Sequence, residues 1–364
     1  MLKNISKDYF IMKKLRLKFN FLNRKILLLL GLIIIIGCVS FFNTLKKIYM
    51  PNVIIKNHPF AYVYIPTGSN IEDVCNILYK DNYIINRNSF EWLAERKHYS
   101  NHIKAGRYKI KNRMSNNKLI NLLRSGKQEP VRLTFSNIRT PEQLAGYAGS
   151  HLEADSLSLI HLFHDKLFLS FYGYNRDNVF SAFIPNTYEL FWNTTAEGFL
   201  KRMFYENQKF WHGERQKKAK EIGLSPVEVT ILASIIDNES NRTSEYPTIA
   251  GVYMNRLKKG MLLQADPTVK FALGDLSIKR VKRIQTEINS PYNTYKYKGL
   301  PPGPISMPTV KAIDAVLNYE KHDYLYFCAR ADSTGLHAFA KTLYQHNQNA
   351  IAYQNALNKK RIYN

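Results

Sequence analysis

The sequence predicts an α+β protein in three parts: a single N-terminal transmembrane helix, a small module of strand, helix, helix, strand order, and a larger mixed α/β domain. An apolar run behind a basic N-terminus predicts the first part, at residues 26–45. Alternating strand and helix patterns predict the second part over residues 60–128 and the third over residues 129–364. The chain has 364 residues, of which 45% are hydrophobic and 22% charged, and this suffices for two packed domains besides the apolar run.

The apolar run is long enough to cross a membrane. Residues 26–42 are apolar apart from two glycines and one serine, and residues 43–45 extend the run to about 20 residues, or roughly 30 Å of helix. Eight basic residues precede the run and only Lys46 and Lys47 follow it closely. The positive-inside rule therefore places residues 1–25 in the cytoplasm as a basic tail. Residues 46–59 then form a tether, and the bulk of the chain lies on the periplasmic or extracytoplasmic side.

A cleavable leader is the alternative for this region. A basic stretch before an apolar run also begins a signal peptide, and residues 35–38 are similar to a lipoprotein processing site at which Cys38 would be lipidated. The 25-residue lead-in is long for a signal peptide, and the apolar run is long for the core of one. Both lengths favour an uncleaved anchor.

The small module is predicted from local patterns. Residues 60–65 alternate as a strand does, and a helix then begins at Ser69, which forms a capping box with Glu72. A second helix covers about residues 89–97, and residues 108–110 form a returning strand. A further helix begins at Ser115 and ends at Gly126.

The net charge of +24 favours anionic partners, with a generally lysine-rich surface as the alternative explanation. No basic-aromatic motif of the nucleic-acid-binding kind occurs, so no nucleic-acid partner is expected. Cys38, Cys75 and Cys328 lie far apart and form no C-x-x-C pair. Since Cys38 lies in the apolar run, at most one disulfide is possible, and no metal site or cofactor is expected.

The larger domain begins with a short strand at residues 131–135, followed by a helix that Thr140 caps and Pro141 opens. The chain is then mostly helical to about residue 208, with an interruption at residues 184–188. Another helix begins at Ser225, with a proline at its first position and Glu228 as the capping-box partner. Its next eight residues are almost wholly apolar, which predicts a buried helix.

Glu239 lies at the end of this buried helix and is the candidate acid. Ile235 and Leu232 precede it by four and seven residues, so its carboxyl projects from the face that turns to the protein interior. A carboxyl that is partly desolvated keeps its proton to higher pH, as a general acid must near neutrality. Asp237 lies on another face. The alternative is a solvated glutamate at a helix end.

Polar and aromatic residues on proline-containing loops follow Glu239 in the sequence, and such clusters often line a sugar-binding groove. The candidate substrate-binding residues are Asn255, Gln264, Asp266, Tyr292, Asn293, Tyr295 and His337. Turn or cap formation is the alternative for the loop residues, and packing beside Phe339 is the alternative for His337.

The chain contains an ordered set of motifs: Ala-Ser-Ile-Ile-Asp-Asn-Glu-Ser at 233–240, Asn-Arg-Leu at 255–257, Gln-Ala-Asp-Pro-Thr at 264–268, Tyr-Asn-Thr-Tyr at 292–295, Leu-Pro-Pro-Gly-Pro-Ile at 300–305, and a C-terminal Gly-Leu-His-Ala-Phe-Ala-Lys-Thr at 335–342 with His346 and Asn347. Together these motifs resemble the endolytic murein transglycosylases, the YceG-like family. The resemblance covers the anchor, the small module and the whole larger domain. It implies that the module is LysM-like and that residues 129–364 form a YceG-like catalytic domain.

The resemblance also implies an activity. Such an enzyme is a lyase of the bacterial cytoplasmic membrane that cleaves the bond between N-acetylmuramic acid (MurNAc) and N-acetylglucosamine (GlcNAc) in peptidoglycan. The C6 hydroxyl of the same muramic acid attacks, a 1,6-anhydro-MurNAc end forms, and nascent glycan strands are terminated. Glu239 aligns with the catalytic acid of the family. The partners are glycan strands and the cell membrane, with peptidoglycan synthases as candidate protein partners.

Two residues depart from the family pattern, and two other functions stay open. Asp237 stands where the family usually has glutamate, and Asn186 stands where it usually has aspartate. The second change removes a carboxylate and leaves only its hydrogen bonding. The alternatives are a non-catalytic peptidoglycan-binding or cell-wall-synthesis scaffold, and a hydrolase that pairs Glu239 with Asp266 or Asp237.

Overall fold

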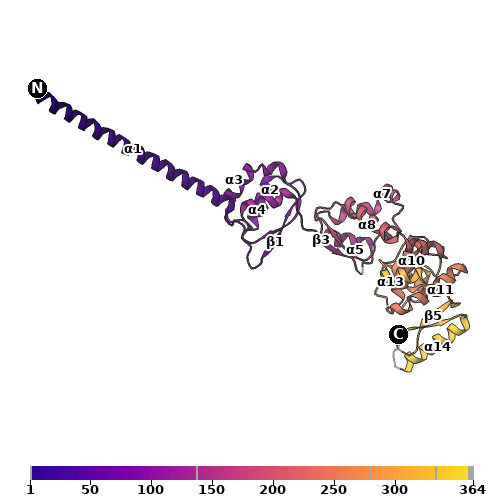
Figure 1. Cartoon of the computed structure of the whole chain (residues 1–364). Helices are drawn as coiled ribbons and strands as arrows, with labels where there is room; N and C mark the ends of the chain where they lie inside the picture. The colour runs from indigo at the N-terminus through magenta and orange to yellow at the C-terminus, as the bar shows by residue number, and fades with distance from the viewer. Residues whose placement is uncertain (1, 137, 279, 333, 360–364) are drawn as a thin grey trace. The chain divides into compact units, whose positions relative to one another are not determined.

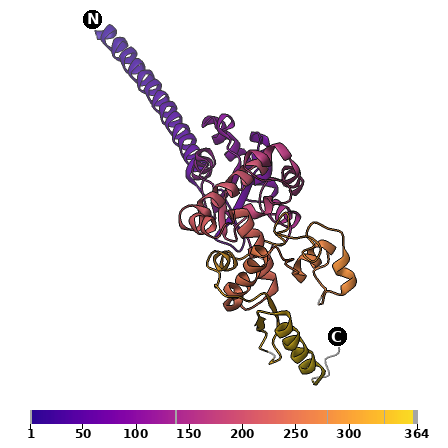
Figure 2. The same ribbon diagram turned by 90° about the vertical axis from the view of Figure 1, so that its right-hand side faces the viewer.

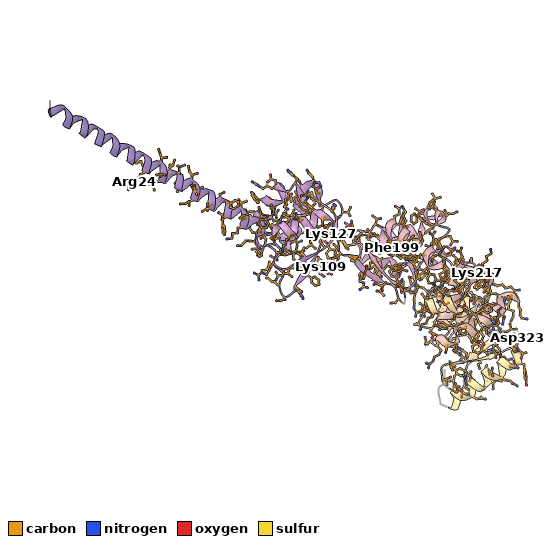
Figure 3. All side chains as sticks on the ribbon, in the orientation of Figure 1. Arg24, Lys109, Lys127, Phe199, Lys217 and Asp323 are labelled. Atoms are coloured by element: carbon orange, nitrogen blue, oxygen red, sulfur yellow. The ribbon has the colours of Figure 1, made fainter. Side chains whose placement is uncertain are left out.

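A computed structural model describes residues 2–136, 138–278, 280–332 and 334–359 of the chain, and the described side chains begin at Arg24 (Figures 1 and 3). The chain divides into two compact units, Met1–Glu129 and Pro130–Asn364.

The first unit begins with the long helix α1 (Leu2–Tyr49). At 1.5 Å per residue its 48 residues span about 72 Å. The most apolar 18 residues within Arg24–Tyr49 have a mean hydropathy of 2.7, and none of these residues is buried in the protein. Within the described part of the chain, this is the one helix long and apolar enough to cross a membrane. The predicted apolar segment is therefore helical and uncovered, as a membrane anchor or a leader would be.

The rest of the first unit has the predicted order of strand, helix, helix and strand. Strands β1 and β2 pair antiparallel, with Val63 opposite Tyr108, and both of these side chains point into the core. The sheet, whose Lys109 is labelled in Figure 3, packs with the helices around a core of its own. The elements after α1 are β1 (Phe60–Ile65), α2 (Ile71–Lys80), α3 (Arg87–Arg96), the 3-10 turn η1 (Tyr99–His102), β2 (Gly106–Lys111) and α4 (Asn116–Ser125).

The segment predicted as a tether, residues 46–59, packs against this module over part of its length. Helix α1 continues to Tyr49, and the side chain of Asn116 donates a hydrogen bond of 2.9 Å to the backbone oxygen of Lys47. Val53 is buried in the core, and its backbone N–H donates to the oxygen of Met114 over 3.0 Å. The helix end is therefore anchored directly to the module.

The start of α2 corrects a second prediction, because Asn70 rather than Ser69 caps this helix. The Asn70 side chain accepts a 3.0 Å hydrogen bond from the backbone N–H of Asp73, and the Asp73 carboxylate accepts one of 2.8 Å from the backbone N–H of Asn70. The hydroxyl of Ser69 instead donates to the oxygen of Pro66 over 2.8 Å. A turn therefore uses the residue that was expected to cap the helix.

The second unit contains two hydrophobic cores, the first built around β3, β4 and the helices that follow them. Strand β3 pairs antiparallel with β4, and Phe199 of α8, labelled in Figure 3, is fully buried in this core. The elements of this part are β3 (Val131–Thr134), α5 (Pro141–Gly149), α6 (Ser156–His164), α7 (Lys166–Phe171), η2 (Val179–Ala182), β4 (Thr187–Leu190) and α8 (Ala196–Trp211).

The second core surrounds the buried helix α10, whose predicted cap is present. Ser225 and Glu228 form the capping box, and Pro226 is the first helical residue. Residues 229–236 are all buried, and α10 contacts α9, α11, α12 and α13. The remaining elements are α9 (Glu214–Glu221), α10 (Pro226–Glu239), η3 (Thr243–Glu245), α11 (Tyr246–Lys258), α12 (Asp266–Leu273), η4 (Arg283–Glu287), α13 (Val310–Leu317), β5 (Tyr326–Ala329), β6 (His337–Ala340) and α14 (Leu343–Lys359).

The antiparallel hairpin β5–β6 and helix α14 lie beside each other in both ribbon views (Figures 1 and 2). Phe327 of β5 meets Tyr253 of α11 edge to face, with 5.9 Å between ring centroids. The hairpin is therefore attached next to the C-terminal end of α10, where Glu239 lies.

Candidate functional site

A cavity of about 480 Å³ opens at the C-terminal end of α10. Segments far apart in the sequence form its walls, namely the ends of α10 and α12, one face of α11, the 292–295 loop and the β5–β6 hairpin with α14. Five of the predicted site residues meet here. The lining residues are Glu239, Tyr253, Arg256, Leu263, Gln264, Asp266, Tyr295, Tyr326, Phe327, Cys328, Ala329, His337, Leu343 and His346.

The Glu239 carboxyl is strongly perturbed by its position in this cavity. Burial raises its pKa to about 7, the nearby negative charge of Asp266 adds to the effect, and a hydrogen bond from Tyr253 opposes it. Near neutral pH the carboxyl therefore exists in both protonation states. Such a group can donate a proton in one step and accept one in the next.

Tyr253 holds the carboxyl in place. Its hydroxyl donates a 2.6 Å hydrogen bond to Oε1 of Glu239, and its ring is 1% exposed. Burial, the Glu239 charge and this hydrogen bond raise the pKa of Tyr253 well above its ordinary value, so the phenol stays protonated and remains a donor. Sequence reasoning missed Tyr253, which reads as a core residue of α11.

Asp266 and Tyr295 form a second hydrogen-bonded pair in the cavity. The hydroxyl of Tyr295 donates a 2.6 Å hydrogen bond to Oδ1 of Asp266, the first residue of α12. Burial, followed by this hydrogen bond, raises the pKa of Tyr295. The loop before α12 is joined to the 292–295 loop, because the backbone N–H of Gln264 donates to the oxygen of Thr294 over 3.0 Å. The two loops thus form one wall.

Arg256 joins this wall to the β5–β6 hairpin. Its guanidinium is buried and donates a hydrogen bond of 2.7 Å to the backbone oxygen of Leu325 and another of 2.7 Å to that of Leu263. It also reaches the side-chain oxygen of Gln264 at 3.5 Å. A buried guanidinium needs several acceptors, and backbone oxygens from two segments supply them here. Arg256 belongs to the Asn-Arg-Leu motif at 255–257 but was not among the predicted site residues.

His337 enters the cavity from β6 with one ring nitrogen anchored. Its backbone N–H donates to Oε1 of Glu245 over 2.7 Å, and Nδ1 lies 2.9 Å from Oε2 of the same carboxylate. The hydroxyl of Ser240, next to the acid, donates to that Oε2 over 3.0 Å. Glu245 therefore orients the imidazole, and it is a further residue that sequence reasoning missed.

Three predicted substrate-binding residues do not line this cavity. Asn293 is fully buried and donates to the backbone oxygens of Thr286 and Ile288, each over 2.8 Å, so it shapes the loop. Tyr292 packs against Phe271. Asn255 donates to the backbone oxygens of residues 322 and 324 over 2.7 and 3.0 Å. The side-chain amides of Asn255 and Asn293 are thus used inside the protein, and a substrate contact of these three residues stays a prediction.

The two departures from the family pattern also lie outside the cavity. Asp237 accepts hydrogen bonds of 2.8 Å each from the hydroxyls of Tyr246 and Thr309 and so joins α10 to the starts of α11 and α13. Asn186 is exposed and accepts a 2.8 Å hydrogen bond from the backbone N–H of Thr187. Among the described residues, no group of three or more histidine, cysteine, aspartate or glutamate side chains could hold a metal ion.

The comparisons of this chain with known proteins agree with one another. A sequence model of the YceG-like family matches residues 63–352. The endolytic murein transglycosylase of Bacillus subtilis (strain 168) is 30% identical over 316 residues, covering 82% of this chain and 86% of that protein. The enzyme of the same name from Streptococcus pneumoniae (strain R6) is 28% identical over 331 residues, which cover 82% of this chain but only 59% of the pneumococcal protein.

A solved structure shares the fold. A crystal structure of a YceG-like protein from Listeria monocytogenes matches with a TM-score of 0.54 at 29% identity, covering 80% of this chain and 98% of that one. Glu239 and all the other residues that line the cavity fall within the segment that the family model matches.

Proposed function

This chain belongs to the YceG-like family, and we propose that it is an endolytic lytic transglycosylase that cleaves the glycan strands of peptidoglycan. One observation carries the proposal: a single carboxyl with a pKa of about 7, Glu239, faces a cavity in a chain whose relatives are named endolytic murein transglycosylases.

The proposed reaction needs only this one carboxyl group. Protonated Glu239 gives its proton to the GlcNAc O4 oxygen as the bond from MurNAc C1 to that oxygen breaks. The C6 hydroxyl of the same MurNAc then bonds to C1 and returns its proton to Glu239, which leaves a 1,6-anhydro-MurNAc end. Because the nucleophile belongs to the substrate, its attack is intramolecular and much of its entropic cost is already met on binding.

The other polar residues of the cavity have supporting roles in this proposal. Tyr253 fixes the direction of the acid through its 2.6 Å hydrogen bond. Asp266 stabilises the positive charge that develops at C1, and Gln264 and His337 bind sugar hydroxyl or amide groups. The ring of Tyr295, held by Asp266, offers a face on which a sugar can stack.

The hydrolase alternative is supported by one observation, since Asp266 shares the cavity with Glu239 and could activate water. It predicts reducing ends, whereas the transglycosylase predicts 1,6-anhydro ends and a non-catalytic scaffold predicts no new ends. Mass spectrometry of the fragments released from purified sacculi separates the three outcomes.

We expect anhydro ends from the wild type, a loss of at least about 100-fold in Glu239→Gln, and normal activity in Glu221→Gln, which changes an exposed glutamate of α9. Undiminished anhydro product from Glu239→Gln would refute the assignment of the acid.

We propose that α1 anchors the enzyme in the cytoplasmic membrane with residues 1–25 in the cytoplasm. The length and hydropathy of Arg24–Tyr49 support this anchor. The module at residues 60–128 would then be a LysM-like glycan-binding unit that presents nascent strands for termination. The intact mass of membrane-extracted protein distinguishes an uncleaved helix from a form cleaved and lipidated at Cys38. Labelling of Lys217→Cys with a membrane-impermeant maleimide in spheroplasts tests the orientation, and a residue reached only after lysis would contradict it.

A further inference from the structure

A second cavity of about 370 Å³ lies beside the first, in the same unit. The ends of α10 and α12, the segment before α5 and the 305–307 segment form its walls. The lining residues are Ile138, Arg139, Asp237, Asn238, Asn241, Pro267, Lys270, Leu276, Ile305, Ser306 and Met307.

The two cavities share the elements that carry the candidate acid. Asn238 lines the second cavity and Glu239 the first, and likewise Pro267 lines the second and Asp266 the first. Lys270, one turn further along α12, is close enough to Glu239 for its charge to lower the pKa of that carboxyl. A polymer bound across Glu239 would therefore extend from one cavity toward the other.

The charges of the second cavity suit an anion. Arg139 is exposed and Lys270 is half-buried, and neither forms an ion pair with an acidic side chain in the part of the chain that the structure describes. The one carboxylate of the lining, Asp237, already accepts hydrogen bonds from Tyr246 and Thr309. Two cations thus face the cavity against one carboxylate that the protein itself has satisfied.

The rest of the lining is mixed and mainly polar at its surface. Ile138, Ile305 and Met307 are mostly buried, and the parts of them that reach the cavity form a small apolar floor. Asn238 uses its amide N–H groups on Ser306 Oγ and on the backbone oxygen of Ser234, each over 2.8 Å. The volume lies in the range of sites that bind small ligands, about 300–1,000 Å³.

We propose that this second cavity binds the carboxylate-bearing substituent of a muramyl residue next to the bond that is cut. The proposal rests on the function proposed above and deepens it, because an enzyme that cuts inside a strand must bind sugars on both sides of the bond. The substituents of muramyl residues are short peptides rich in alanine and dicarboxylic acids, which combine methyl groups with carboxylates. Arg139 and Lys270 pair with the carboxylates, and the apolar floor receives the methyl groups.

The test measures binding by the full-length protein in detergent, with Glu239→Gln as the parent so that no strand is cut. Three soluble glycan ligands are compared: strands with their peptides, the same strands with the peptide carboxylates converted to amides, and strands stripped of peptides, which keep only the lactyl carboxylate. The double variant Arg139→Gln/Lys270→Gln removes both cations. Lys217→Gln/Lys220→Gln, on exposed α9, is the matched control for charge, and Lys217 is labelled in Figure 3.

We expect the parent to bind peptide-bearing strands about 10-fold more tightly than amidated ones, as two partly exposed ion pairs allow. The Arg139/Lys270 double variant should lose this preference and bind amidated strands as the parent does, whereas the control should keep it. Removal of the peptide frees the lactyl carboxylate, so binding of stripped strands that also depends on the two cations would support recognition of a carboxylate by Arg139 and Lys270.

Equal affinity of the parent for charged and amidated strands would overturn the inference, as would a double variant that keeps the preference. If the parent binds no strand at all, the proposed function fails together with this inference. If it binds strands without dependence on Arg139 and Lys270, only this inference fails. Unchanged melting temperatures of the variants show that folding is not the cause of a loss.

Discussion

Replacing Tyr253 with phenylalanine removes one hydroxyl and tests the acid directly. The ring keeps its place against Phe327, but Glu239 loses the 2.6 Å hydrogen bond that holds its pKa down. A hydrogen bond to a charged group contributes about 1.5–3 kcal/mol. Since one pKa unit corresponds to about 1.4 kcal/mol, the pKa of Glu239 should rise by roughly 1–2 units from its value of about 7.

The pH profile of the reaction reports this rise. If protonated Glu239 is the acid, kcat/KM falls as the pH rises through its pKa, and the alkaline limb of Tyr253→Phe moves upward by about 1–2 pH units. Initial rates of anhydro-muropeptide release, measured between about pH 5 and pH 10, locate the limb.

Tyr319→Phe is the matched control, because it removes a hydroxyl that accepts a hydrogen bond from the exposed Lys258. Its limb should stay in place. An unchanged limb in Tyr253→Phe, or one displaced to lower pH, would refute the reasoning.

Three further predictions concern stability. Folding raises the pKa of Glu239 from its ordinary value of 4.5 to about 7. The protonated carboxyl therefore contributes fully to stability at a pH below 4.5, and this contribution is lost as the pH rises through about 7. Because glutamine does not ionise, the free energy of unfolding of Glu239→Gln should exceed that of the wild type by about 3 kcal/mol above about pH 8. Urea melts should show this difference above about pH 8 and no difference near about pH 4. Asn293→Ala leaves buried backbone oxygens without a donor and should cost about 2–4 kcal/mol in urea melts, with an unchanged alkaline limb. Gly251→Ala would place a Cβ 2.3 Å from the backbone oxygen of Glu320 and should lower stability by about 1–3 kcal/mol, whereas Gly146→Ala, with open space around it, should raise stability by up to about 1 kcal/mol.

The helix starts show which parts of the fold local sequence can predict. Ser225, Pro226 and Glu228 interact within a few residues of one another, so their spacing alone was sufficient to predict the start of α10. Near residue 70 two possible capping pairs have the same spacing, Ser69 with Glu72 and Asn70 with Asp73. The hydroxyl of Ser69 donates to the oxygen of Pro66, and Asn70 caps the helix. Such a choice depends on a turn that the capping pattern does not contain.

The candidate site divides along similar lines. Tyr292, Asn293 and Tyr295 are close neighbours in the sequence, yet only Tyr295 faces the cavity. Which way each side chain points depends on how the loop packs on its surroundings, and periodicity does not predict this for a loop.

Tyr253 was missed because a tyrosine within an apolar helix is usually a core residue. It lies three residues before Arg256 and therefore on the same face of α11, a spacing that could have identified both.

The β5–β6 hairpin and the start of α14 are synthesised after the other segments that line the cavity. Glu239 and Tyr253 leave the ribosome well before His337, Leu343 and His346, which complete the cavity wall. A polypeptide that stops before this wall carries Glu239 in a cavity that lacks part of its lining, so the carboxyl is less enclosed. On the proposed function, nascent or truncated chains that lack this wall would cleave glycan strands more slowly than the full-length protein.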